Sequence, residues 1–326
     1  MGMHNEIHQQ PEVFRRILAD NTGPISDVVG SLNAADFGYV VIAARGTSDN
    51  AARYAKYLWG AHNRLPVALA APSLFTSYQS PPDLAHSLVV GISQSGESPD
   101  LIEVIAEGRR QGRPTLAITN QPDSPLAANA DFIIDIKAGD EHAVAATKTY
   151  TAQLLAVAMV SDLLTHGAIS DELHRAPGLM TDVLQNERYI TDIAKDFAVL
   201  RSCAILGRGY NHSTAFEWAL KLQEVTYALA HPYSTADFRH GPIAVVEPGF
   251  SVMAAAPDGP LFGDMLALLG DLSQQRHART VTISNRGEAL ETSRYGIPLP
   301  ATTPEWISPM PIIAAAQLFT YHLGKI

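Results

Sequence analysis

The chain has 326 residues, of which 46% are hydrophobic and 17% are charged. This composition excludes an intrinsically disordered chain, and the length allows one large domain or two domains of ordinary size. The formal net charge is −10 and no segment is rich in lysine or arginine, which argues against a nucleic-acid or anionic-membrane partner. An anionic ligand must therefore be held by local dipoles and hydrogen-bond donors.

The only cysteine, Cys203, excludes an internal disulfide and a cysteine-based zinc site, and its apolar neighbours predict a small core residue. The N-terminal residues lack the apolar region of a secretory signal. The longest apolar stretch, 152–164, is shorter than the ~18 to 20 residues that span a bilayer. We therefore expect a cytoplasmic protein that has no membrane partner.

The first predicted elements are a buried strand over 39–44, an Arg-Gly turn at Arg45 and a helix over 49–58. A second buried strand over 88–92 is followed, after a short loop, by an amphipathic helix over 99–110. Both segments therefore follow the same order of strand, turn and helix.

The loop between the second strand and its helix is rich in hydrogen-bond donors, and its polar members are Ser93, Gln94, Ser95 and Ser98. Gly96 allows a tight turn, and we expect the first N–H groups of the helix to point toward the loop. Serine is also a favoured helix cap, but four polar donors in six residues exceed what a cap needs. The pattern predicts an anion site, with phosphate as the simplest occupant.

The second half of the chain repeats this order. A strand over 202–206, an Arg-Gly turn at Arg208 and a helix over 213–229 resemble 39–58, and the two arginines are 208 − 45 = 163 residues apart. The same shift pairs 88–93 with 251–256 and, after a slip of two residues, 115–120 with 280–285. Two copies of one fold are the simplest explanation.

Within each copy, short apolar runs alternate with longer helical patterns, which indicates βαβ units and a parallel sheet covered by helices on both faces. We therefore predict an α/β fold with two tandem doubly wound domains. Ligands of such sheets bind at the carboxyl ends of the strands, where the serine-rich loop lies. Its counterpart at 254–260 has no serine and contains Asp258, so we expect only the first copy to bind phosphate well.

The predicted organisation has four parts. They are an N-terminal helical segment (1–30), a first domain with the phosphate site (31–168), a helical connector (169–198) and a second domain with the catalytic residues (199–326). The connector contains no long Gly/Pro-rich linker, so we expect the two domains to be packed together.

Five short motifs stand along the chain in this order: RGTS (45–48), SQSGES (93–98), AGDE with VAATK (138–148), ALKLQE (219–224) and FRHGP (238–242). Their order and spacing resemble the sugar isomerase (SIS) domain pair. The likeness is to the isomerase half of glutamine-fructose-6-phosphate aminotransferase and to related stand-alone glucosamine-6-phosphate deaminases. It runs from about residue 37 to residue 326.

The resemblance implies roles for individual residues. Those expected to bind the sugar phosphate are Ser93, Gln94, Ser95, Ser98, Thr47 and Ser48, with the backbone of Val144 near the sugar. Glu224 is expected to move a proton between C1 and C2 of the open-chain sugar, and His240 to assist ring opening. In the family this histidine comes from the neighbouring subunit, which implies a homodimer with a shared active site.

These residue types suit the chemistry. Aldose–ketose interconversion needs a base beside two adjacent carbons, a proton donor or acceptor at the ring oxygen and exclusion of water, and it needs neither a metal nor a cofactor. Lys221 lies three residues before Glu224, so an ion pair that orients Glu224 and an imine with the sugar carbonyl are both possible roles. The same question applies to Lys148.

The remaining histidines are given no role. They include His62, His166, His174 and His277, and they show no close metal-ligand spacing. We expect them to be surface or core residues.

The chain departs from the family pattern at both ends. Full-length glutamine-dependent members begin with a catalytic cysteine in a separate glutaminase domain, which is not present here, so we expect no glutaminase activity. Members also continue into a tail that carries a catalytic lysine, whereas this sequence stops at Ile326. That role is not transferred to Lys325.

The predicted function is therefore that of an enzyme that interconverts glucosamine 6-phosphate with fructose 6-phosphate and ammonia. Two alternatives stay open. One is a non-catalytic phosphosugar-binding regulator, and the other is a deaminase or deglycase for a different amino-sugar phosphate.

Overall fold

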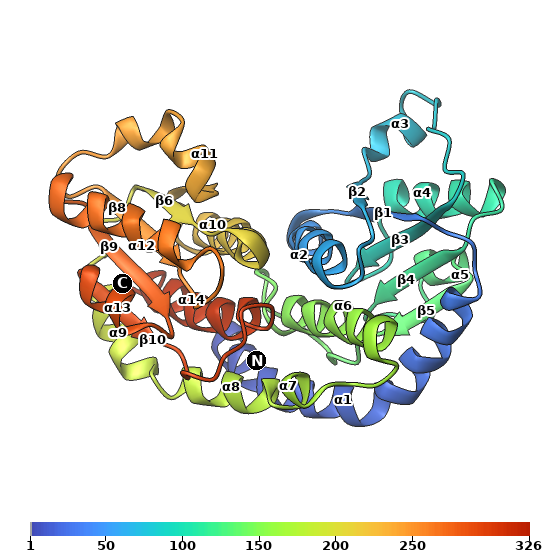
Figure 1. Ribbon diagram of the computed structural model, residues 1–326, viewed down its shortest axis with the longest axis horizontal. Helices are drawn as coiled ribbons and strands as arrows, with labels where there is room; N and C mark the ends of the chain where they lie inside the picture. Colours follow the sequence, from blue (N-terminus) through green and yellow to red (C-terminus); the bar gives the residue numbers. More distant parts are fainter. Residues whose placement is uncertain (1) are drawn as a thin grey trace. The chain divides into compact units, whose positions relative to one another are not determined.

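The computed structural model describes residues 2–326, which form two compact units (Figure 1). The β1–β5 unit consists of Glu12–Glu141 and Lys148–His174. The β6–β10 unit consists of the residues up to Pro11, His142–Thr147 and Arg175–Ile326. Each unit contains one parallel five-stranded sheet.

The sheet of the β1–β5 unit has the strand order β2-β1-β3-β4-β5. Its strands are β1 (Tyr39–Ala44), β2 (Val67–Leu69), β3 (Ser87–Ser93), β4 (Thr115–Thr119) and β5 (Phe132–Asp135). Its helices are α1 (Met3–Asn33), of which the residues to Pro11 belong to the other unit, α2 (Gly46–His62), α3 (Pro72–Thr76), α4 (Pro99–Arg110), α5 (Pro125–Ala128), α6 (Lys148–His166) and α7 (Asp171–His174).

Successive side chains of a strand point to opposite faces of the sheet, and both faces of this sheet are apolar. Val41 and Val89 pack in one cluster with Val104 of α4 and Leu126 of α5, while α2 and α6 pack against each other. All residues of β3 are buried, which explains why its sequence reads as a continuous apolar run. The long apolar stretch at 152–164 lies in α6, whose residues from Lys148 to Leu163 are all buried. It is a core helix.

The sheet of the β6–β10 unit has the strand order β10-β9-β8-β6-β7. Its strands are β6 (Ser202–Leu206), β7 (Leu229–Tyr233), β8 (Ser251–Ala255), β9 (Arg279–Ser284) and β10 (Tyr295–Pro298). Its helices are α8 (Ala176–Leu184), α9 (Glu187–Lys195), η1 (Gly209–Asn211), α10 (His212–Thr226), α11 (Thr235–Arg239), η2 (Pro242–Val245), α12 (Phe262–Gly270), the π-helical turn η3 (Asp271–Gln275), α13 (Gly287–Thr292) and α14 (Pro309–Leu323).

The two sheets have the same topology. When β6 to β10 are matched to β1 to β5 in chain order, both sheets read second-first-third-fourth-fifth strand, and every pairing is parallel. The predicted α/β fold and internal repeat are confirmed.

An ion pair is also repeated. Arg45, after β1, bonds Asp100 in the first turn of α4, and Arg208, after β6, bonds Asp264 in the first turn of α12. Each pair ties the end of a first strand to the helix that follows the third strand. We call them the Arg–Asp pairs.

One predicted boundary was wrong. The helix expected over 213–229 ends at Thr226, because Tyr227 adopts a left-handed conformation (φ 59°), and Leu229 already begins β7. Cys203 is fully buried in β6, and burial raises the pKa of its thiol to about 12, in agreement with a core role. Within residues 2–326, none of the helices combines the length and apolar character needed to cross a membrane.

Candidate functional site

The topology of the β1–β5 unit singles out one position for a ligand. In a sheet of order 2-1-3-4-5, the connections from β1 and β3 leave in opposite directions, which opens a crevice at the carboxyl ends of these neighbouring strands. Ala44 and Ile92 are paired at these ends. The turn at Arg45–Ser48 follows β1, and the loop at Gln94–Ser98 follows β3. Both predicted phosphate-binding segments therefore lie at this switch point.

In the serine loop, residues 93–98, two backbone N–H groups donate hydrogen bonds to serine hydroxyl oxygens of the same loop. The N–H of Gly96 donates to Ser93 Oγ (3.1 Å), and the N–H of Glu97 donates to Ser95 Oγ (3.3 Å). A hydroxyl whose oxygen accepts an N–H bond can still donate its own proton. The loop therefore offers hydroxyl hydrogens to an anion, whereas the amides of Gly96 and Glu97 are used within the loop.

Gly96 is required by the shape of the loop. Its φ of +65° is a left-handed conformation, and a Cβ at this position would lie 2.0 Å from Ser124 Oγ. The carbonyl of Gly96 accepts a hydrogen bond from the N–H of Leu126 (3.0 Å), and the N–H of Asn120 donates to the carbonyl of Gln94 (3.2 Å). The loop is thus fixed to the segment that follows β4.

Ser98 takes the N-cap position of α4, but among the described residues of that helix its side chain caps none. Its carbonyl accepts bonds from the N–H groups of Leu101 and Ile102 (both 3.1 Å), and Pro99 has no N–H. The bond from Ile102 is the first ordinary i→i−4 bond of the helix, and Leu101 makes a tighter i→i−3 bond to the same carbonyl. That the first amides of this helix point at a ligand stays a prediction.

The turn after β1 contributes two more predicted residues. Ser48 is buried in the first turn of α2, and its Oγ accepts a hydrogen bond from Gln153 Nε2 of α6 (3.0 Å). Thr47 is half-buried beside it. Asp100 would repel a phosphate, but its Oδ2 accepts from Arg45 Nε (2.7 Å), and this neutralises its charge.

The predicted acid–base residues lie in the β6–β10 unit, on α10. Lys221 is 1% exposed, and its Nζ lies 2.6 Å from Glu224 Oε2 and 3.4 Å from Glu217 Oε1. Glu217 is fully buried, whereas the side chain of Glu224 is 33% exposed. The predicted ion pair between Lys221 and Glu224 is confirmed. In this ion pair the ammonium group of Lys221 is buried, and the carboxylate of Glu224 is accessible.

Val144 and His240 belong to the same unit as Glu224. Val144 is fully exposed in the segment His142–Thr147, and His240 is exposed directly after α11. The segment around Val144 is held by the buried carboxylate of Glu6, which accepts bonds from the N–H groups of His142 (2.6 Å) and Ala143 (3.1 Å).

The corresponding loop of the β6–β10 unit is closed. After β8 the chain runs through Asp258 and Gly259, and a Cβ at Gly259 would lie 2.5 Å from Glu305 Oε2. Asp258 pairs with Arg286 Nη1 (2.6 Å). Burial and the nearby Asp258 raise the pKa of Glu305. The remaining hollow has a volume of only ≈ 10 Å³.

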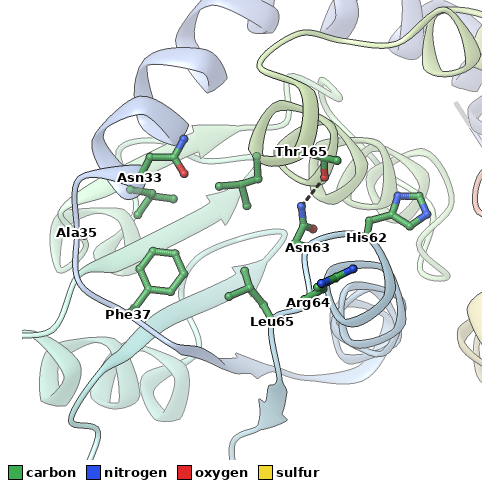
Figure 2. A pocket seen from close by; sticks show the side chains of 10 residues that line it. Asn33, Ala35, Phe37, His62, Asn63, Arg64, Leu65 and Thr165 are labelled. Atoms are coloured by element: carbon green, nitrogen blue, oxygen red, sulfur yellow. Dashed lines mark hydrogen bonds between the residues drawn. The ribbon is translucent and has the colours of Figure 1, made fainter.

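Another hollow of the β1–β5 unit, with a volume of ≈ 340 Å³, lies away from the serine loop (Figure 2). Phe37, which lines it, precedes β1, so the hollow lies at the amino ends of the strands, opposite to the edge where such sheets bind ligands. Burial lowers the pKa of His62, which also lines it, and Asn63 Nδ2 donates to Thr165 Oγ1 across it (2.8 Å). We assign it no role in the reaction.

Sequence reasoning missed three residues that organise the predicted ones. Glu217 was detectable, because it lies four residues before Lys221 on the same helix face. Gln153 and Glu6 were not, because their partners lie 105 and 136 residues away in the chain.

Comparisons with known proteins agree with the repeated architecture. Residues 36–161 and 197–323 both match the family model described as SIS domain. The chain is 36% identical over 339 residues to glutamine–fructose-6-phosphate aminotransferase (isomerizing) of Gloeobacter violaceus, covering 99% of the chain and 55% of that protein. The chain thus spans about half the length of this curated relative.

Solved structures show the same fold over nearly the whole chain. The C-terminal domain of glucosamine-fructose-6-phosphate aminotransferase from Francisella tularensis matches with a TM-score of 0.87 and 27% identity, covering 99% of this chain and 95% of that one. Glucosamine-6-phosphate deaminase from Thermotoga maritima matches with a TM-score of 0.77, covering 99% and 94%. Its identity is 20%, so this second match shows the fold alone.

Proposed function

Because the chain belongs to the SIS-domain family of phosphosugar isomerases, we propose that it converts glucosamine 6-phosphate and water into fructose 6-phosphate and ammonia, or catalyses the reverse reaction. The observation that carries this proposal is the carboxylate of Glu224, held by the buried ammonium group of Lys221. The proposal assigns the phosphate group of the substrate to the serine loop of the β1–β5 unit.

The chemistry requires one base that serves two adjacent carbons. Glu224 removes the proton from C2 of the open-chain aldehyde, the electron pair moves to the C1 carbonyl oxygen, which takes up a proton, and an enolamine forms. Return of the proton from Glu224 to C1 gives an iminium ion at C2, which becomes an imine when its nitrogen loses a proton. Water adds to this imine, the C2–N bond breaks, and fructose 6-phosphate and ammonia leave.

Lys221 acts as a positioning residue in this scheme. Its ammonium group contacts two carboxylates and is 1% exposed, which favours the ion pair over an imine with the sugar, because an imine requires a neutral and accessible amine. Its ammonium group, 2.6 Å from Oε2, fixes the rotamer of the Glu224 side chain.

The serine loop supports the choice of a phosphorylated substrate. Hydrogen bonds to an ionised group contribute about 1.5–3 kcal/mol each, so several hydroxyl donors provide strong binding without a lysine or arginine in the loop. Binding energy from a phosphate group remote from the reacting carbons can be used to orient a substrate for the reaction.

The first experiment measures ammonia release and fructose 6-phosphate formation from glucosamine 6-phosphate in coupled assays. Galactosamine 6-phosphate and a 6-phosphorylated fructosamine adduct are tested alongside it. Turnover of glucosamine 6-phosphate above the other two is the expected result. Tight phosphosugar binding without turnover of any of them would instead favour a regulator, and preferred turnover of another substrate would redirect the proposal to that sugar.

We also propose a homodimer in which His240 serves the site of the partner subunit. The Glu224→Gln and His240→Ala variants, each of low activity, are mixed under conditions that exchange subunits. If the site is shared, mixed dimers contain one site with both residues intact, and part of the activity returns. A purely additive activity in a mixture shown to contain mixed dimers would refute the shared site.

A further inference from the structure

Three histidines of the β6–β10 unit converge on one carboxylate. Glu187 Oε1 lies 2.6 Å from His4 Nε2 and 2.8 Å from His322 Nε2, and Glu187 Oε2 lies 2.9 Å from His8 Nε2. The contributing helices are α1, α9 and α14, so the cluster joins segments that are 183 and 135 residues apart in the chain. None of these residues belongs to the proposed phosphosugar site.

The local structure holds the four side chains in place. His4 and His8 are one helical turn apart on α1, so their rings share a face, with centroids 4.7 Å apart. The ring of Tyr321 packs beside His4 (5.1 Å) and beside His322 (5.1 Å). The imidazole groups are therefore oriented before any ligand arrives.

The geometry is close to that of a metal centre. The ligand atoms of His4, Glu187 and His322 all lie within 4.8 Å of one another. Around a tetrahedral zinc ion with bonds of about 2.0–2.1 Å, neighbouring ligand atoms lie about 3.3 Å apart. The contacts of Glu187 with His4 and His322, now 2.6 and 2.8 Å, would have to lengthen by about 0.7 and 0.5 Å. A bound ion would replace the N–H···O bonds by bonds to the imidazole lone pairs.

The charge and the surroundings also suit a cation. Glu187 supplies the carboxylate on which the three imidazole groups converge. The side chains are 19–37% exposed. A hollow of ≈ 450 Å³, lined by Met3, His4 and Tyr321 among others, borders the cluster on the side of His4.

We propose that His4, His322 and Glu187 bind one divalent transition-metal ion, such as Zn²⁺, and that His8 orients Glu187 through its second oxygen. Two imidazoles and a carboxylate, with a fourth position open to water, form a ligand set that suits zinc, nickel and copper. The bound ion would tie the start of α1 to α9 and α14, and it would stabilise the folded state by mass action.

The test uses the untagged, full-length protein after chelator treatment and dialysis. Titration calorimetry with ZnCl₂ is expected to show one site per chain, and Co²⁺ is expected to give the intense visible absorption of a tetrahedral site. Zn²⁺ is also expected to raise the melting temperature. Failure to bind Zn²⁺ or Co²⁺ at one ion per chain would overturn the proposal and leave the proposed function untouched.

Variants separate a metal site from a set of structural hydrogen bonds. His4→Ala and His322→Ala should lower Zn²⁺ affinity at least about 100-fold, and His8→Ala about 10- to 100-fold, as expected for a group that orients a ligand. His231→Ala, which removes an exposed histidine of the same unit, is the control and should bind Zn²⁺ normally.

Glu187→Gln is the most discriminating variant. The amide oxygen still accepts hydrogen bonds from the histidines, so the metal-free variant should keep most of its thermal stability, while the affinity for Zn²⁺ and the Co²⁺ absorption fall sharply. Zn²⁺ affinity equal to that of the unmodified protein in Glu187→Gln, His4→Ala and His322→Ala would show that these residues do not bind the ion.

Discussion

The loop after β3 and the loop after β8 occupy equivalent places in two sheets of identical topology, and yet they have opposite properties. The first presents serine hydroxyls around the left-handed Gly96, whereas the second is occupied by the carboxyl group of Glu305 beside Gly259. Both retain the Arg–Asp pair next to the loop. The comparison shows that one duplicated scaffold carries two loops of different chemistry at the same place in the fold.

If one copy binds the phosphate and the other supplies the base, the largest loss of activity should come from a substitution in the unit without the serine loop. Glu224→Gln removes the proposed base but keeps the size of the side chain, and we expect kcat to fall by about 10²- to 10⁴-fold with little change in KM. Steady-state kinetics with glucosamine 6-phosphate measure this. An unchanged kcat would remove Glu224 from the mechanism.

The two matched glycines give the next largest effect. Gly96→Ala places a methyl group against Ser124 in a left-handed conformation, so we expect phosphosugar affinity to fall on the order of 100-fold and the unfolding free energy to fall by about 1–3 kcal/mol. Gly259→Ala strains the other loop and should lower stability only. Calorimetric titration with the sugar phosphate and thermal melts distinguish the two. Equal loss of affinity in both variants would contradict the assignment of the phosphate to one copy.

A smaller effect is expected at Ser98, because one hydroxyl is lost and α4 keeps its structure. Ser98→Ala should weaken phosphosugar binding about 10-fold. The melting temperature should stay the same, since this side chain caps none of the described residues of the helix. Ser98→Thr retains the hydroxyl and should bind normally. A fall in stability without a change in affinity would mean that Ser98 is a structural residue only.

The smallest effect concerns Glu305 in the closed loop. Because its folded-state pKa is raised above 4.5, the protonated form stabilises the fold, and this contribution is lost as the pH rises through the folded-state pKa. Glu305→Gln should therefore increase stability at pH 7 relative to the original protein, by less than about 1 kcal/mol, and have little effect at pH 4. Chemical denaturation at the two pH values measures the difference. An equal effect at both would exclude a buried, titrating carboxyl group.

The sequence predicted the features that depend on neighbouring residues. The Arg-Gly turns revealed the repeat, because each follows an apolar strand and precedes a helix, and the ion pair of Lys221 with Glu224 followed from helical spacing. Contacts between distant segments could not be predicted in this way. The bond from Gln153 to Ser48 depends on how α6 packs on α2, and the cluster around Glu187 depends on three helices meeting.

The prediction of free amides at the start of α4 did not allow for acceptors within the loop. A loop that opens a helix was expected to present free amides, but Leu101 donates to the carbonyl of Ser98, and the amide of Gly96 is bonded to Ser93. The serine oxygens and a backbone carbonyl compete for the same N–H groups that an anion would use. The three-dimensional structure is needed to show which of these oxygens accepts each N–H group.

The Arg–Asp pairs have a consequence for the ancestry of the gene. The pair stands beside the serine loop and beside the loop that Glu305 fills, so it is best explained as inherited from the single domain that was duplicated. The loop after β8 then differs from the serine loop in its own side chains, while the strand order and the Arg–Asp pair around it are the same. Grafting residues 93–98 after β8, with Glu305 shortened to alanine, offers a direct route to a protein that binds two phosphosugars per chain.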